Sequence, residues 1–99
     1  TNKTPMPSIF SLKQNYPNPF NPSTKIKYDL PKETFVTINI LDLKGAKIMS
    51  LVNSKQSAGY KEISWNGLNN SGSQLPAGLY FLTIQTEEYF NSKKMILLR

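Results

Sequence analysis

The sequence predicts an all-β domain, an antiparallel immunoglobulin-like β-sandwich of about seven strands. Apolar and polar residues alternate with the period of a strand over several segments. Clusters of turn-forming residues separate these segments at intervals of about 8–12 residues, which is typical of sandwiches. No segment shows the periodicity of an amphipathic helix. The Cys-Trp-Cys pattern of antibody domains is absent, so the prediction concerns the architecture alone.

The clearest strand signal covers residues 76–86, where a Pro-Ala-Gly entrance precedes a run of aromatic and β-branched residues. Pro76 has no N–H for a sheet ladder, so it belongs at or before the start of the strand. Gly78 permits a positive φ or a close backbone approach at the same entrance. The face of this strand that we expect in the core comprises Tyr80, Leu82 and Ile84.

The N-terminal part of the chain is expected to contain a linker and a short strand. Residues 1–8 hold two prolines and few apolar side chains, which favours a linker, so the domain should span residues 9–99. A first short strand is expected within residues 9–16. The chain starts without methionine, so we interpret it as part of a longer protein.

Residues 15–24 contain three prolines, at positions 17, 19 and 22, and favour a stiff, non-helical corner. Tyr16 and Phe20 are the side chains expected to seat this corner on the core. Pro17 and Pro19 would hold its shape.

The remaining strands are expected over residues 24–30, 35–43, 46–52, 60–66 and 89–98. Gly45 would supply a positive φ for a tight hairpin between two of them. In the strand over residues 46–52, Ile48 and either Leu51 or Val52 should face inward, with a bulge between them. Trp65, the single tryptophan, should be a core anchor. The polar segments 53–59 and 66–75 are expected to be loops.

The composition argues against catalysis. Without histidine the chain lacks the commonest general base and metal ligand, and without cysteine it has no thiolate site. Its six acidic residues follow no catalytic spacing, so we expect no enzyme activity and no cofactor. The Asn-rich segment 66–72 could bind calcium, but it has no carboxylate, and its amides are expected to satisfy the local backbone.

The net charge of +6 has two interpretations. The lysines could be scattered for solubility, or an acidic partner could bind the domain. Only Lys93, Lys94 and Arg99 gather near one end of the sequence. The chain has no recognition helix and no aromatic-basic RNA-binding motif, so nucleic acid is not an expected partner. No apolar run is long enough to span a membrane.

Five segments occur in the order of a known family. They are the Asn-Tyr-Pro-Asn-Pro-Phe-Asn-Pro motif at 15–22, the strand and turn at 36–45, Trp65-Asn66-Gly67, the Gly-x-Tyr strand at 76–80, and the basic and then apolar terminus at 93–99. From about residue 11 to residue 99, the chain resembles the C-terminal sorting domain, type A, of the type IX (Por) secretion system of Bacteroidetes-like bacteria. One departure is Ala46, which separates the turn glycine from the basic residue Lys47.

The resemblance implies a role in secretion. Such a domain follows an upstream cargo domain in the same chain and directs it through the outer membrane. The implied partners are the type IX translocon, an outer-membrane shuttle protein and a sortase-like peptidase. The peptidase can cleave the domain and replace it with a surface anchor, here in or before residues 1–8. The protein would be exported through the periplasm to the cell surface or the medium.

We therefore expect the last strand to contact the receptor. The candidate recognition residues are Lys93, Lys94, Met95, Leu97 and Arg99. A terminal strand can offer its edge for strand addition, and a basic pair can steer an acidic partner. Gly78 and Tyr80 would hold the sheet that displays this strand. The alternative is that the last strand is a plain core strand.

Two other functions stay open from the sequence. A carbohydrate-binding sandwich could use an aromatic platform, with the candidates Tyr16, Phe20, Tyr60, Tyr89 and Phe90. A structural Ig-like spacer, similar to the domain of flagellar hook-capping proteins, shares the Gly-x-Tyr region.

Overall fold

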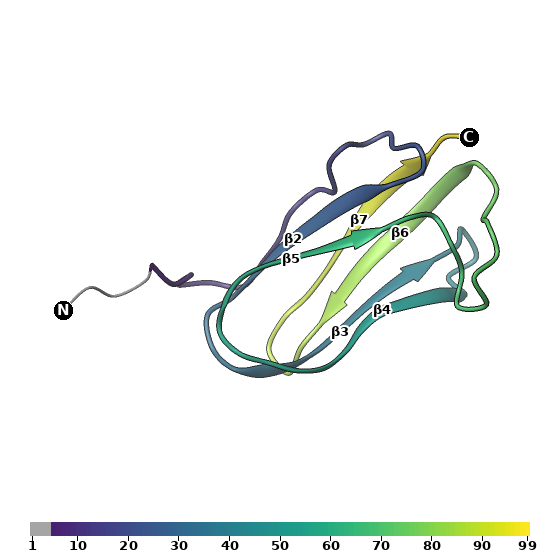
Figure 1. The fold of residues 1–99 in the computed structure, drawn as a ribbon. Coiled ribbons are helices and arrows are strands. Elements are labelled where there is room, and N and C mark those ends of the chain that lie inside the picture. The colour runs from purple at the N-terminus through teal and green to yellow at the C-terminus, as the bar shows by residue number, and fades with distance from the viewer. Residues whose placement is uncertain (1–4) are drawn as a thin grey trace.

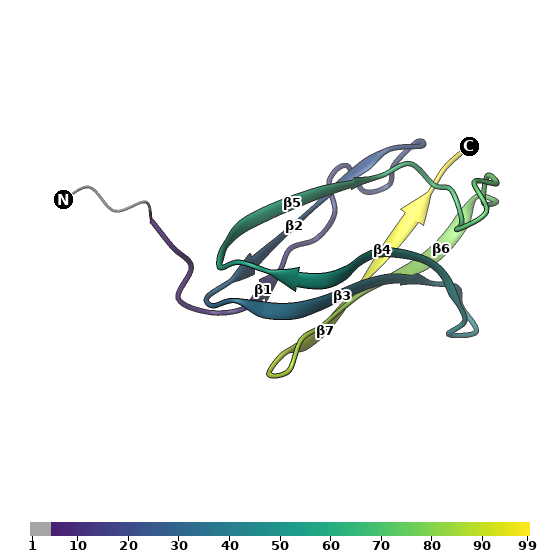
Figure 2. The same ribbon diagram turned by 60° about the horizontal axis from the view of Figure 1, so that its bottom comes forward.

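The structure, a computed structural model, describes residues 5–99 as β-strands joined by turns and loops (Figure 1). Two layers of strands pack against each other (Figure 2). The described residues contain no helix, so the predicted all-β sandwich is confirmed. The strands are β1 (Ser11–Leu12), β2 (Thr24–Leu30), β3 (Thr34–Leu41), β4 (Lys47–Gln56), β5 (Gly59–Trp65), β6 (Gly78–Gln85) and β7 (Phe90–Leu97).

The two sheets have an immunoglobulin-like strand order with one change. One sheet has the order β1-β2-β5 and the other β4-β3-β6-β7, and all neighbouring strands are antiparallel. In a constant-type immunoglobulin domain the fourth strand joins the sheet of the first two. Here β4 pairs with β3 instead. The chain therefore crosses from one sheet to the other between β4 and β5, through Ser57 and Ala58 alone.

The core is built from alternate positions of the strands. The strands β2, β3 and β6 each place three apolar side chains between the sheets, and these are Ile26, Tyr28, Leu30, Val36, Ile38, Ile40, Tyr80, Leu82 and Ile84. These are the inward faces that the alternation predicts. Burying one such aliphatic side chain stabilises the fold by about 1.5–3 kcal/mol, so this layer holds the two sheets together.

Trp65 anchors one end of the core. Its ring centroid lies 5.6 Å from that of Phe20 and 6.1 Å from that of Tyr80. Its indole Nε1 donates a hydrogen bond of 2.9 Å to the carbonyl of Leu68, so the polar end of the buried ring is satisfied. The burial expected for Trp65 and Phe20 is confirmed. Phe20 seats the proline-rich corner on the core.

The strand β4 is longer than expected. It continues to Gln56, so the loop predicted over residues 53–59 is wrong, and only Ser57 and Ala58 lie between β4 and β5. Residues 53–56 lie in an edge strand, where their backbone pairs with β3 and most of their side chains are exposed to solvent. This exposure explains why they are polar. The expected bulge is confirmed: the register of β4 against β3 shifts twice, beside Leu51 and beside Ile48.

The N-terminal strand is shorter than expected. Only Ser11 and Leu12 form β1, and Leu12 is buried, whereas Ile9 is largely exposed. The predicted strand over residues 9–16 is therefore wrong over most of its length. Of the predicted linker, residues 1–4 lie outside the described residues. Residues 5–8 have no regular secondary structure, and Pro7 is buried.

The β3–β4 hairpin confirms the expected positive φ of Gly45, which is +85°. Ahead of it, the Asp42 carboxylate accepts hydrogen bonds of 2.9 Å from the backbone N–H groups of Lys44 and Ala46. At the entrance of β6, Gly78 also has a positive φ, of +153°. A Cβ there would meet nothing within 4 Å, so backbone conformation rather than space favours glycine.

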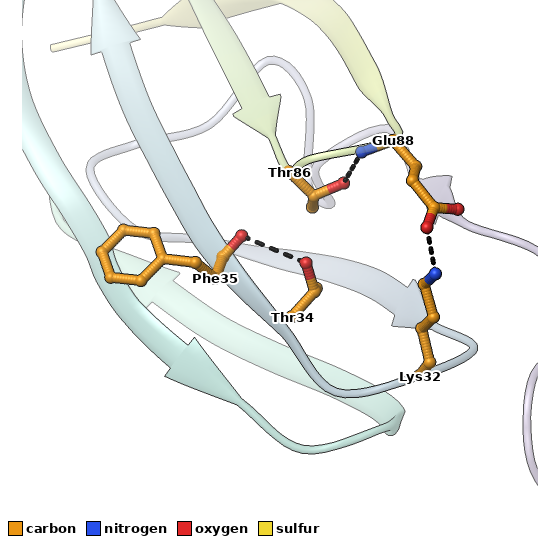
Figure 3. Close-up of polar contacts among 5 residues, drawn as sticks. All are labelled: Lys32, Thr34, Phe35, Thr86 and Glu88. Carbon is orange, nitrogen blue, oxygen red and sulfur yellow. Dashed lines mark hydrogen bonds and ion pairs between the residues drawn. The ribbon is translucent and has the colours of Figure 1, made fainter.

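Polar contacts join two turns at the opposite end of the sandwich (Figure 3). The Lys32 ammonium, in the turn between β2 and β3, pairs with the Glu88 carboxylate, in the turn between β6 and β7. Within the second turn, the backbone N–H of Glu88 donates to the hydroxyl of Thr86. Because both charged side chains are about half exposed, this pair contributes at most about 1 kcal/mol.

Candidate recognition site at the C-terminal strand

The last strand, β7, is an edge strand that contributes directly to the core. It pairs only with β6 in its sheet, and Met95 and Leu97 point between the two sheets with no exposed surface. This corrects their expected role as receptor contacts, because a fully buried side chain cannot touch a partner of the folded domain. The side chains of β7 that face outward are those of Phe90, Ser92, Lys94 and Ile96.

Lys93 and Lys94 do not form one basic patch. Successive residues of a strand point to opposite faces. Lys93 aligns with Leu82, whose side chain is buried, and Lys94 aligns with Phe81, on the outer face. Lys94 is exposed and Lys93 is only half exposed. The two lysines therefore do not act as one adjacent basic pair, and a receptor contact by either of them remains a prediction.

The proline-rich corner covers the C-terminal half of the β7 edge. Phe20 pairs with this edge through its N–H, which donates to the carbonyl of Ile96, and its carbonyl, which accepts from the N–H of Leu98. The Asn18 side chain accepts a hydrogen bond of 3.0 Å from the N–H of Ile96. The Gln14 side chain donates one of 2.7 Å to the carbonyl of Lys94. Figure 1 shows this segment beside the end of β7.

We call these contacts of residues 14–20 with residues 94–98 the terminal clasp. Edge strands tend to pair with other chains, and natural proteins often block them. The clasp blocks strand addition over this half of β7. Within the described residues, only the half of the edge that precedes Lys94 is left without such a cover, so any strand addition is limited to that half.

Arg99 is bound to the domain through its side chain. Its guanidinium donates hydrogen bonds of 2.8 Å to the carbonyl of Leu75 and 2.9 Å to that of Gly67. A Cβ at Gly67 would lie 3.0 Å from the guanidinium Nη2 of Arg99, so glycine allows this close approach. These donors hold the loop between β5 and β6, while Arg99 itself stays exposed, so a receptor contact by Arg99 remains a prediction.

Tyr80 lies beside Gly78 in the strand that pairs with β7. Its ring is buried against Trp65, and its hydroxyl donates a hydrogen bond of 2.6 Å to the carbonyl of Pro76. Burial raises the pKa of Tyr80 above its usual value; nearby Arg99 opposes the shift and Asp42 adds to it. The contact resembles the tyrosine corner of immunoglobulin domains, in which a tyrosine hydroxyl binds the backbone a few residues upstream.

The corner holds its shape through a residue that the sequence did not single out. The buried Asn15 donates from its side chain to the carbonyl of Pro17 and to the hydroxyl of Thr24. Pro17 and Pro19 are exposed, and the peptide bonds that precede Pro17, Pro19 and Pro22 are cis. The position of Asn15, a short polar residue directly before Tyr16-Pro17, is the sequence signal that could have indicated its structural role.

Tyr16 does not seat the corner, which corrects its expected role. Its side chain is 80 % exposed and lies next to Lys25 on the outer face of the three-stranded sheet. Only its backbone is engaged, in a bridge with Lys25. Phe20 alone of the two aromatic residues packs into the core.

The five aromatic candidates for a sugar platform do not all lie on one surface, although Tyr16 and Tyr60 are both exposed on the three-stranded sheet. Phe20 is buried, and Tyr89 stacks on Phe10 with ring centroids 5.5 Å apart. Tyr60 lies in the three-stranded sheet and Phe90 in the four-stranded sheet, so these two exposed rings belong to different layers.

The Asn-rich segment uses its amides for the backbone. The side-chain Oδ1 of Asn69 accepts hydrogen bonds from the backbone N–H groups of Ser71 and Ser73. The side-chain Oδ1 of Asn70 accepts one from the backbone N–H of Ser50, in the edge strand β4. Residues 5–99 contain no group of three or more His, Cys, Asp or Glu side chains placed to hold a metal. They also contain no helix long and apolar enough to cross a membrane.

A model of one protein family, the FlgD Ig-like domain, matches residues 20–88. This match covers more than half of the chain. The chain belongs to the FlgD Ig-like domain family. The family match ends before β7 and begins at Phe20, so most of the terminal clasp lies outside it. No curated protein matches the sequence.

Solved structures with a similar fold come from two bacteria. FlgD of Pseudomonas aeruginosa is 27 % identical, with a TM-score of 0.58 over 76 % of this chain and 59 % of its own. Dimeric latent PorU of Porphyromonas gingivalis is 21 % identical, with a TM-score of 0.67 over 93 % of this chain and 9 % of its own. PorZ is described as an essential surface component of the type IX secretion system of the same species. It is 17 % identical, with a TM-score of 0.59 over 87 % of this chain and 11 % of its own.

This chain therefore spans about a tenth of PorU and PorZ and less than two thirds of FlgD. At these identities, the likeness to PorU and PorZ concerns the fold alone.

Proposed function

We propose that this FlgD Ig-like domain is a sorting domain of the type IX secretion system. The observation that carries the proposal is the terminal clasp. The segments of residues 14–20 and 94–98 lie mostly outside the family match, and they bind each other through four hydrogen bonds. Two of the five segments that carry the sorting resemblance, 15–22 and 93–99, contain most of these clasp residues. The chain thus combines the sandwich of the family with two paired segments, 14–20 and 94–98, which the resemblance associates with export.

The similar folds support the same proposal. The PorU match takes in 93 % of this chain, which is more than the family model covers. PorZ is described as part of the type IX system. In the proposed role, the domain acts without catalysis and follows a cargo domain. It engages the translocon, a shuttle protein and a sortase-like peptidase on the way to the cell surface or the medium.

A second candidate is a structural Ig-like module. The observation that favours it is the family match itself, together with the 27 % identity to FlgD of Pseudomonas aeruginosa. A spacer needs only a stable sandwich with its ends available for connection. It would not need the terminal clasp, nor a particular position in the protein.

Export of a fusion protein separates the two functions. A periplasmic reporter is joined to the N-terminus of this chain and produced in a bacterium that has a type IX system. The matched control carries the Ig-like domain of Pseudomonas aeruginosa FlgD in place of this chain, since it shares the sandwich. We expect the reporter in the medium or on the surface for this chain alone, and only when the translocon is intact. Retention of both fusions, or export without the translocon, would refute sorting.

A further inference from the structure

The outer face of the four-stranded sheet carries a continuous apolar patch. Leu41 of β3, Leu79 and Phe81 of β6, and Ile96 of β7 alternate with buried residues, so they point away from the core. The register aligns Leu41 with Phe81 and Leu79 with Ile96. Directly opposed side chains on one face of a sheet touch, so these four form one surface. Each is partly exposed, and Ile96 is 38 % exposed.

A lysine stands at each end of this patch. The register forms one row across all four strands, from Lys47 of β4 through Leu41 and Phe81 to Lys94 of β7. Both lysines are exposed. Neighbouring strands lie about 4.8 Å apart, so three steps separate the two lysines by roughly 14 Å. We call the surface formed by Lys47, Leu41, Phe81, Lys94, Leu79 and Ile96 the lysine-flanked patch.

Neither lysine of this patch forms an ion pair within the described residues. The strands β3, β4, β6 and β7 contain no acidic residue, and no carboxylate of residues 5–99 lies within ion-pair distance of Lys47 or Lys94. The nearby turn residue Asp42 uses its carboxylate to bind backbone N–H groups.

The outer face of the other sheet differs. There Glu62 lies 3.8 Å from Lys25 and 3.9 Å from Lys27, and Asp29 lies 3.3 Å from Lys13. The two sheets thus present one face whose lysines lie in ion pairs and one face with apolar side chains between two lysines that form none. Surface charge that is left uncompensated beside apolar area is the arrangement that complements an acidic partner.

We propose that the lysine-flanked patch is the docking surface for a protein that presents carboxylates on either side of an apolar segment. This inference rests on the proposed function and names the surface and the chemistry by which the sorting domain is recognised. The partial burial of these side chains favours a protein over a lipid bilayer, because half-buried side chains of a sheet cannot reach several ångströms into acyl chains. A shallow hollow of ≈ 300 Å³ beside Leu79, between the β3–β4 turn and the start of β6, adds room for a partner side chain.

The test uses the reporter fusion with Lys47→Gln and Lys94→Gln together. The matched control carries Lys25→Gln and Lys27→Gln, which lower the net charge equally on the opposite face. Neither pair lies in the core, and thermal unfolding of each purified domain checks the fold. We expect export of the first variant to fall about tenfold, as loss of steering and of two charge contacts implies, and export of the control to stay near that of the unsubstituted fusion. A second variant, Leu79→Ser with Ile96→Ser, should lower export similarly.

The outcomes distinguish the two proposals. If the unsubstituted fusion is not exported, the sorting function fails and the docking surface fails with it. If the fusion is exported and both patch variants are exported equally well, the docking inference alone is overturned. Purified domain is also mixed with vesicles of phosphatidylglycerol and phosphatidylcholine in equal parts. If the domain binds these vesicles and Lys47→Gln with Lys94→Gln abolishes the binding, the patch recognises a lipid surface and the inference is overturned. If sedimentation shows a dimer that the same changes disrupt, the patch binds a second copy of the domain, and the inference is overturned as well.

Discussion

Two buried tyrosine side chains, Tyr28 and Tyr80, donate hydrogen bonds at the edge of the core. Tyr28 of β2 donates its hydroxyl proton to the side-chain oxygen of Gln56 of β4, at 2.6 Å, and so joins the two sheets. Tyr80 makes its bond of 2.6 Å to the carbonyl of Pro76. In both residues the ring is buried and the hydroxyl is satisfied. A buried phenol must therefore stay protonated to keep its hydrogen bond.

Stability should consequently fall at high pH. Burial is the main cause that raises the pKa of Tyr28 and of Tyr80, although the Gln56 bond and Arg99 respectively oppose it. Both folded-state pKa values thus exceed the unfolded value of about 10. The stabilisation is complete below about pH 10 and is lost as the pH rises through the folded-state values.

Urea unfolding from about pH 8 to pH 11.5 measures this loss. The decline should be shallower in Tyr28→Phe, which removes one of the two groups, and lysine titration is common to both proteins. An identical decline in the variant would show that Tyr28 does not contribute.

The residues of the regular strands were predictable, while those of the corner were not. In β2 and β3 a strict alternation marks Ile26 or Ile38 as inward because one face must be buried. Tyr16 and Phe20 are both aromatic residues in a proline-rich segment without a period. The sequence therefore gave no physical reason to bury Phe20 and expose Tyr16.

At the scale of elements, the decisive feature is how the two edges of the four-stranded sheet are closed. An asparagine from a loop binds the backbone of each edge strand: Asn70 binds Ser50 of β4, and Asn18 binds Ile96 of β7. Each side chain takes a ladder position that another chain could otherwise occupy. These contacts join segments 20 and 78 residues apart.

Asn18→Ala should loosen the C-terminal half of β7 without unfolding the domain. A typical hydrogen bond contributes about 0.5–1.5 kcal/mol, so hydrogen exchange of the Ile96 amide should accelerate about three- to tenfold. Amide exchange followed by NMR measures the change at each residue. Asn21→Ala is the control, because Asn21 is exposed and makes no side-chain hydrogen bond within the described residues. Equal protection of Ile96 in both variants would contradict the role of Asn18.

The length and cover of edge strands could not be predicted from the sequence. Residues 53–56 of β4 are polar because a strand at a sheet edge needs few apolar residues, so composition alone favoured a loop. In β7, Lys93 and Lys94 are adjacent in the chain but face opposite ways once the strand forms. The assignment of Met95 and Leu97 to recognition failed for a related reason, because the sequence did not distinguish a display strand from a core strand.

For the molecule as a whole, the last strand cannot be removed without loss of the fold. Met95 and Leu97 have no exposed surface, and losing one such side chain costs about 2–5 kcal/mol. Domains of this kind are stable by only about 5–15 kcal/mol. A chain that ends at Ser92 should therefore show no cooperative thermal unfolding in circular dichroism, whereas Ile96→Ser should unfold cooperatively. A cooperative transition in the shortened chain would contradict this account.

The same reasoning affects how deletions are interpreted. Loss of export after removal of residues 93–99 would not separate recognition from folding, because the deletion removes both. The outward substitutions at Lys47 and Lys94 leave the buried side chains in place, so they test the surface by itself.

The terminal clasp also determines how early during synthesis the domain can complete its folding. Gln14 and Lys94 are 80 positions apart, and Asn18 and Ile96 are 78 apart. Nearly all of the domain must therefore have left the ribosome before these partners can meet. Pairings between such distant positions form more slowly than local ones, and these pairings cannot form before β7 is available. Closure of this domain consequently has to wait until β7 has been synthesised and has left the ribosome.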